Sequence, residues 1–158
     1  MNRTLRYGTH IPILLKAMQI THGPVLEMGC GLGSTPLLFW LCQDQDREFI
    51  SYENDEEWIK KIGYPVTFVD NWDKADIEKK HWSLAFLDHR PGDRRYVDAL
   101  RIKDKTDLLV LHDSEPDLDK FYLYRRIYPY FKYRFDYTKF LPNTVVLSNL
   151  IDVKKLLK

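Results

Sequence analysis

The feature that most constrains the fold is a short apolar run followed by a glycine at every second position and then by a helical pattern. Residues 25–28 have the composition of a buried strand, and residues 29–33 form a glycine-rich turn. Pro36 suits the first turn of the following helix, whose apolar residues lie at 37–41. A strand, a tight turn and a helix in this order form the basic unit of α/β proteins.

The rest of the chain continues this alternation of strands and helices. Further strands are predicted at 49–53, 66–69, 83–88 and 107–112, and helices at 11–20, 55–62, 94–102 and 117–128. Two last strands, 133–137 and 144–148, are joined by a turn too short for a crossover, so they should pair as a hairpin. We therefore predict an α/β, Rossmann-like three-layer sandwich whose seven-stranded, mostly parallel sheet ends in an antiparallel C-terminal hairpin.

Composition bounds the domain count and the partners. The 158 residues are enough for a single domain, 1–158, and 44% hydrophobic and 30% charged residues are a globular balance. The net charge of +1 provides no field that attracts nucleic acid or an anionic membrane. No apolar run approaches the roughly 20 residues that span a bilayer, so we expect a cytoplasmic protein. Aromatic residues of the C-terminal hairpin suggest the hypothesis of a homodimer.

Two carboxylates flank the glycine turn and indicate a nucleoside site. Glu27 lies at the end of the first strand, directly before the turn. Glu53 ends the second strand, roughly 20 residues after Gly33, where a carboxylate can accept hydrogen bonds from both hydroxyls of a ribose. The glycines allow the backbone to approach a ligand closely, and the helix start offers free N–H groups.

Three interpretations of this turn remain open. Gly29-x-Gly31-x-x-Ser34 approximates the fingerprint of an NAD-type dinucleotide-binding domain. Glu27 opposes that interpretation, because it would repel a pyrophosphate but could hold a cationic ammonium. The site of a methyl donor is favoured on these grounds, and a purely structural turn is the third interpretation.

Glu27-x-Gly29-x-Gly31-x-Gly33 resembles motif I of the class I S-adenosylmethionine-dependent methyltransferases, and Glu53 resembles their ribose-binding residue. The resemblance implies methyl transfer to an oxygen or nitrogen of a small-molecule acceptor. A cofactor-binding protein without turnover is the alternative. The resemblance to the methyltransferases also implies that the adenine ring lies near Asp70 and Asn71. The cofactor-binding residues that we expect are Glu27, Gly29, Cys30, Gly31, Gly33, Glu53, Asp70, Asn71, Asp88 and His89.

Two later segments place acids and histidines at the ends of strands. Asp88-His89 and His112-Asp113 follow the fourth and fifth strands, whose carboxyl ends line the ligand crevice of an open α/β sheet. Successive strand residues point to opposite faces, so His112 and Asp113 both face the crevice only if the strand has ended. We expect His89 or His112 to act as a general base, oriented by Asp88 or Asp113. The competing interpretation is that these residues have structural roles.

The same segments are similar to the catechol-type O-methyltransferases, in which an Asp-His pair and an Asp-Asn pair follow strands four and five. This resemblance implies a Mg²⁺ ion held by Asp88, Asp113 and Ser114, with His89 as a cofactor contact. The chain departs from the pattern twice. Ser114 occupies the amide position, and Arg90-Pro91-Gly92 stands where that family has its catalytic lysine.

Two remaining segments carry weaker hypotheses. The aromatic and basic stretch 121–131 has the composition of a nucleic-acid surface, but a helix that packs its aromatic side chains on the sheet explains most of it. Residues 6–10, a mixture of Gly and polar groups, precede the first helix and are expected to fold over the cofactor.

Overall fold

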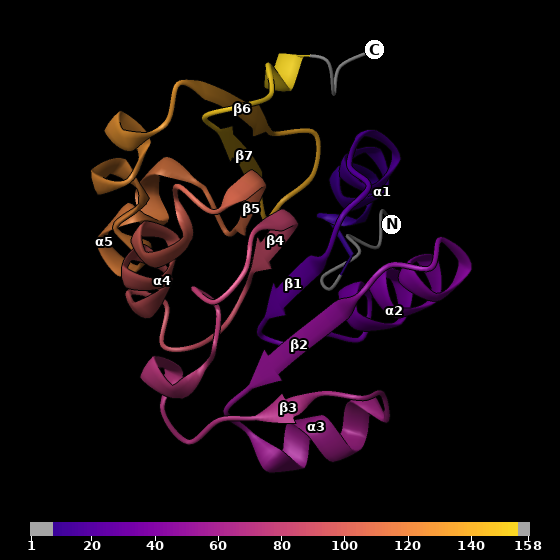
Figure 1. Ribbon diagram of the computed structural model, residues 1–158. Helices are drawn as coiled ribbons and strands as arrows, with labels where there is room; N and C mark the ends of the chain where they lie inside the picture. Colours follow the sequence, from indigo (N-terminus) through magenta and orange to yellow (C-terminus); the bar gives the residue numbers. More distant parts are fainter. Residues whose placement is uncertain (1–7, 155–158) are drawn as a thin grey trace, which may run out of the picture.

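The computed structural model describes residues 8–154, which fold around one twisted seven-stranded sheet (Figure 1). The strand order is β3-β2-β1-β4-β5-β7-β6. The predicted fold class, including the antiparallel C-terminal hairpin, is confirmed. The strands are β1 (Val25–Met28), β2 (Phe49–Glu53), β3 (Thr67–Phe68), β4 (Trp82–Leu87), β5 (Thr106–His112), β6 (Tyr133–Tyr137) and β7 (Thr144–Ser148).

Strand pairing places four carboxyl ends side by side. β1 lies between β2 and β4, and β4 pairs with β5, all in parallel. β7 pairs antiparallel to both β5 and β6. β4 is buried along its whole length, as expected for a central parallel strand covered on both faces. The ends of β1, β2, β4 and β5 therefore meet at one edge of the sheet.

Helices cover both faces of the sheet. On one face, α1 (Ile11–Ile20) and α2 (Ser34–Asp44) bury their apolar sides against β1, β4, β5 and β7. On the other face, α4 (Arg94–Ile102) packs on the sheet together with the segment that follows β5. The helix α3 (Glu56–Ile62) lies near β3 at the sheet edge (Figure 1). No helix within residues 8–154 is long and apolar enough to cross a membrane.

The helix predicted at 117–128 is wrong. The chain instead forms short turns: η2 (Pro116–Leu118), α5 (Asp119–Tyr122), η3 (Tyr124–Arg126) and η4 (Tyr128–Tyr130). Leu123 has a left-handed backbone with φ of 59°, which ends α5. The break allows Tyr124 to enter the core and donate its hydroxyl to the carbonyl oxygen of His112 at 2.8 Å. A tertiary contact thus overrides the local helical pattern.

Candidate functional site

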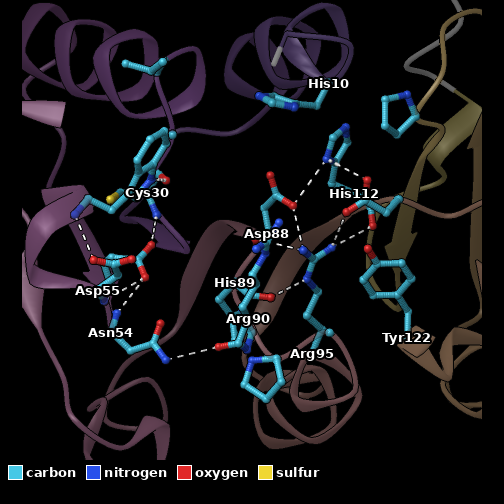
Figure 2. Close-up of a pocket in the computed structure, with 18 of the residues that line it drawn as sticks. His10, Cys30, Asn54, Asp55, Asp88, His89, Arg90, Arg95, His112 and Tyr122 are labelled. Atoms are coloured by element: carbon cyan, nitrogen blue, oxygen red, sulfur yellow. Dashed lines mark hydrogen bonds and ion pairs between the residues drawn. The ribbon is translucent and has the colours of Figure 1, made fainter. Parts of the chain in front are cut away.

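A cleft of about 1260 Å³ opens at the shared carboxyl edge of the sheet (Figure 2). One side, which we call the glycine-loop half, is lined by Cys30, Gly31, Leu32, Glu53 and Phe68. The other side, the histidine half, is lined by His10, Asp88, Arg95, His112 and Asp113. In Figure 2, Cys30 and His112 lie on opposite sides of the view, with Asp88 between them.

Gly29 is required by the close approach of the loop to the end of β4. Its φ is 88°, a left-handed conformation that favours glycine. A Cβ at this position would lie 2.5 Å from the backbone nitrogen of His89 and 2.6 Å from the carbonyl carbon of Asp88. The first glycine of the motif therefore joins the two halves of the cleft. Gly33 is the N-cap of α2 and does not line the cleft.

Glu53 is held rigidly by three backbone donors. Its Oε2 accepts a hydrogen bond from the nitrogen of Cys30 at 3.0 Å, and its Oε1 accepts from Asn54 and Asp55 at 2.8 and 3.2 Å. The indole of Trp58 donates to the carbonyl oxygen of Cys30 at 2.7 Å and fixes the loop from the other side. Burial raises the pKa of Glu53, although the backbone donors offset part of this effect. A preorganised carboxylate thus faces the cleft.

Glu27 is fully buried beneath the loop and does not line the cleft. Its Oε2 accepts hydrogen bonds from Ser51 at 2.6 Å and from Thr35 at 2.8 Å, and the Thr35 hydroxyl in turn accepts from the nitrogen of Gly31. Burial raises the pKa of Glu27 to about 7. Its contacts in this structure support the shape of the loop from below.

Asp70 and Asn71 do not line the cleft in this structure. Asp70 forms an exposed ion pair with Lys74 at 2.7 Å, and Asn71 caps the turn η1 (Trp72–Lys74) by accepting from Asp73. Phe68, an apolar residue that does line the glycine-loop half, is directly opposite Glu53 in the sheet register.

The side chain of Arg95 connects the ends of β4 and β5. It is buried and donates to the carbonyl oxygens of Asp88, His89 and His112 at 2.7 to 3.2 Å. It also forms ion pairs with the carboxylates of Asp88 and Asp113, both at 2.9 Å. No role for Arg95 was predicted, because nothing in the sequence distinguishes it from an exposed arginine of a helix.

His112 and Asp113 both reach the cleft because β5 ends between them. Asp113 has a φ of 58°, which turns the chain out of the strand. The Nδ1 of His112 lies 3.3 Å from Oδ1 of Asp88 and 3.5 Å from Oδ1 of Asp113. Burial disfavours the charged ring, but the hydrogen bond and the charge of Asp88, together with the charge of Asp113, outweigh burial and raise the pKa of His112. For Asp88, burial is likewise outweighed, by His112 and Arg95, and its pKa is lowered.

Two residues before α1 complete the histidine half. Thr9 and His10 are buried, and Oγ1 of Thr9 lies 2.9 Å from Nε2 of His112. The rings of His10 and His112 meet edge to face, with centroids 4.8 Å apart. Burial, together with the charge of His112, lowers the pKa of His10 to about 4. Of the segment 6–10 expected to fold over the cofactor, residues 6 and 7 lie outside the described residues. The sequence analysis did not single out His10.

His89 and Ser114 lie apart from this cluster. His89 is among the residues that line the cleft, but its ring is buried against Trp72 and its Nε2 contacts Oδ2 of Asp98 at 2.9 Å. Burial lowers the pKa of His89. Ser114 lines a separate small pocket, and its nitrogen donates to the carbonyl oxygen of Asn143.

The cleft carries a strong excess of acidic groups. Its arginines are Arg90 and Arg95, and the second is already paired with two carboxylates. Such a surface favours a cationic ligand and disfavours a pyrophosphate. The carboxylates that line it are those of Glu53, Asp55, Glu56, Glu57, Asp88 and Asp113.

No protein-family model and no curated protein matches the sequence. Among solved structures, a methyltransferase from Pyrococcus furiosus aligns with a TM-score of 0.55 at 16% identity, over 89% of this chain and 83% of that one. The chain has a methyltransferase-like fold. The bifunctional kinase-methyltransferase WbdD aligns with a TM-score of 0.55 at 14% identity, over 90% of this chain and 42% of that one. This methyltransferase-like domain thus spans less than half of the WbdD chain.

Proposed function

We propose that the protein binds S-adenosylmethionine in this cleft and transfers its methyl group to an oxygen or nitrogen of a small acceptor. The observation that carries the proposal is the fixed position of the Glu53 carboxylate. Its carboxylate is fixed by the backbone of Cys30, Asn54 and Asp55 at the end of β2. A rigid carboxylate at this place in a methyltransferase-like fold is suited to accept hydrogen bonds from two ribose hydroxyls.

The rest of the glycine-loop half fits a nucleoside of this kind. The backbone of Cys30 and Gly31 lies at the cleft wall without a bulky side chain at Gly31. Phe68, partly exposed beside Glu53, offers an apolar surface to a base. The acidic cleft suits a sulfonium and opposes the pyrophosphate of NAD.

The histidine half provides the groups that the acceptor needs. S-adenosylmethionine, when bound, would supply a methyl group on a positively charged sulfur; the acceptor's lone pair bonds to the methyl carbon as the carbon–sulfur bond breaks, and the sulfur leaves as a neutral thioether. His112, with Asp88 and Asp113, forms a cluster that takes up the proton released by the acceptor. Arg95 holds both carboxylates in place, so the cluster is preorganised to position the acceptor.

Calorimetric titration with S-adenosylmethionine, S-adenosylhomocysteine and NAD tests the proposal. We expect saturable binding of the two sulfur compounds and none of NAD. Glu53→Gln should weaken that binding about 10- to 100-fold, because a charged hydrogen-bond acceptor contributes about 1.5–3 kcal/mol. Glu48→Gln is the matched control, since Glu48 precedes the other end of β2 and pairs with Lys80 at the surface. Binding of NAD alone, or equal binding by both variants, would contradict the proposal.

A further inference from the structure

His10 is a buried histidine whose role the fold does not explain. It is only 3% exposed, and among residues 8–154 neither of its ring nitrogens has a hydrogen-bond partner. A buried polar group without a partner costs free energy, so such groups are rare in folded proteins. The ring also lines the cleft, beside His112 and Asp88. Its nitrogens are therefore available to a ligand.

The neighbours of His10 offer two further donor atoms. One ligand atom each from His10, Asp88 and His112 lies within 4.8 Å of the others. Figure 2 shows the three side chains directed toward a common space. Zn–N bonds of about 2.0–2.1 Å would place such atoms roughly 3.3 Å apart in a tetrahedral site. Binding an ion therefore requires these donor atoms to move closer together, and no hydrogen bond within the described chain holds the His10 ring in its present position.

The surrounding contacts orient the other two donors. Nδ1 of His112 bonds to Asp88 when it carries the ring proton, and Nε2 lies 2.9 Å from the hydroxyl of Thr9. When an ion replaces the Nδ1 proton, Nε2 keeps its own proton and can donate it to Thr9, and the Nδ1 lone pair is directed toward the ion beside Asp88. Arg95 holds Asp88 through Oδ1 at 2.9 Å. Outer contacts of this kind fix the tautomer and the direction of metal ligands.

We propose that His10, Asp88 and His112 bind a divalent transition-metal ion of the Zn²⁺ type. Two imidazole nitrogens and one carboxylate oxygen suit Zn²⁺, Co²⁺ or Fe²⁺, whereas Mg²⁺ prefers a shell of oxygen atoms. Three protein ligands are typical of catalytic metal sites, which keep one position open. This ligand set differs from the oxygen set expected from the sequence, because it replaces Asp113 and Ser114 by two histidines.

The use of the ion rests on the proposed function, whereas its binding does not. The open position adjoins the cleft, where an ion acts as a Lewis acid that lowers the pKa of an acceptor hydroxyl. Asp113, 3.5 Å from His112, is then the neighbouring carboxylate that takes up the proton. The acceptor class that this site favours is a hydroxyl compound.

The experiment uses protein without an affinity tag, freed of metal with a chelator. Co²⁺ is titrated and its visible absorption recorded, and Zn²⁺ and Mg²⁺ are titrated in a calorimeter. We expect saturable binding of Co²⁺ and Zn²⁺ near one ion per chain, and much weaker binding of Mg²⁺. His10→Ala and Asp88→Asn should each weaken Zn²⁺ binding at least tenfold. His81→Ala is the control, because His81 forms a surface pair with Asp107 at 2.6 Å.

His10→Gln is measured beside His10→Ala, so that a folded variant is available if the smaller side chain destabilises the core. Thermal unfolding verifies that each variant is folded. Absence of Co²⁺ and Zn²⁺ binding to the wild type would overturn the inference, as would binding that persists in both His10 variants. Tight Mg²⁺ binding without Zn²⁺ binding would overturn it in favour of an all-oxygen site.

The same titrations separate this inference from the proposed function. Zn²⁺ binding without S-adenosylmethionine binding leaves the metal site in place and overturns the methyl-donor proposal. S-adenosylmethionine binding without Zn²⁺ binding does the reverse.

Discussion

The two halves of the cleft are built in different ways. In the glycine-loop half, backbone groups hold the central carboxylate: Glu53 accepts from the N–H groups of Asn54 and Asp55 beside it and from that of Cys30, 23 residues away. In the histidine half, side chains contact one another across longer distances along the chain, and Thr9 and His112 are 103 residues apart. A binding half held by backbone groups and a reactive half held by contacts between side chains should respond differently to mutation.

The largest effect should come from removing Arg95, which holds the histidine half together. Arg95→Met leaves the carboxylates of Asp88 and Asp113 without their cation, so the free energy of unfolding should fall by about 3–5 kcal/mol. Urea denaturation measures the change. Arg134→Met, which removes an exposed pair with Asp136, should cost less than about 1 kcal/mol. Equal losses of unfolding free energy in the two variants would show that Arg95 stabilises the fold no more than an exposed arginine does.

The junction between the halves is tested by glycine substitutions. Gly29→Ala forces a Cβ to within 2.5 Å of the backbone of His89 at a left-handed φ, which should cost about 3 kcal/mol. Gly63 also has a positive φ, of 71°, but open space around it, so only about 1 kcal/mol is expected for Gly63→Ala. Denaturation of both variants measures the difference. A difference close to zero would mean that the loop does not press on the end of β4.

The contribution of Glu27, buried beneath the glycine loop, to the free energy of unfolding should depend on pH. The pKa of folded Glu27 is about 7, above its ordinary value of 4.5, so the folded state keeps a proton that the unfolded chain loses between these values. The free energy of unfolding should therefore fall as the pH rises from about 4.5 to 7, by an amount on the order of 2–3 kcal/mol. Glu27→Gln should remove this part of the fall, whereas Glu48→Gln should retain it. Identical pH profiles for Glu27→Gln and the wild type would contradict the assignment.

The smallest effect concerns the orientation of Cys30. Trp58→Phe removes the indole donor at 2.7 Å from the carbonyl oxygen of Cys30, so the affinity for S-adenosylmethionine should fall only a few-fold, from the loss of about 1 kcal/mol. Trp40→Phe removes an exposed indole contact to Tyr64 and should leave the affinity unchanged. Calorimetry distinguishes the two variants. Equal affinities of the two variants for S-adenosylmethionine would show that the position of the Cys30 backbone does not affect binding of this ligand.

The features that could be predicted from the sequence belong mostly to the glycine-loop half, and those that could not belong mostly to the histidine half. The strands, the glycine turn and Glu53 depend on local signals, and the topology of the sheet followed from them. The break at Leu123 could not be predicted, because it depends on a tertiary contact of Tyr124. The contacts of Arg95 and His10 with the end of β5 were also missed, because α4 and the start of α1 come close to His112 and Asp113 only in the folded chain.

The structure of the protein with S-adenosylhomocysteine, determined by crystallography, tests the central claim most directly. The claim is that the glycine-loop half holds the nucleoside and the histidine half faces the reacting sulfur. We expect both ribose hydroxyls on Glu53 and the sulfur directed toward Asp88 and His112. A nucleoside seated in the histidine half, or a ligand bound outside this cleft, would contradict the account.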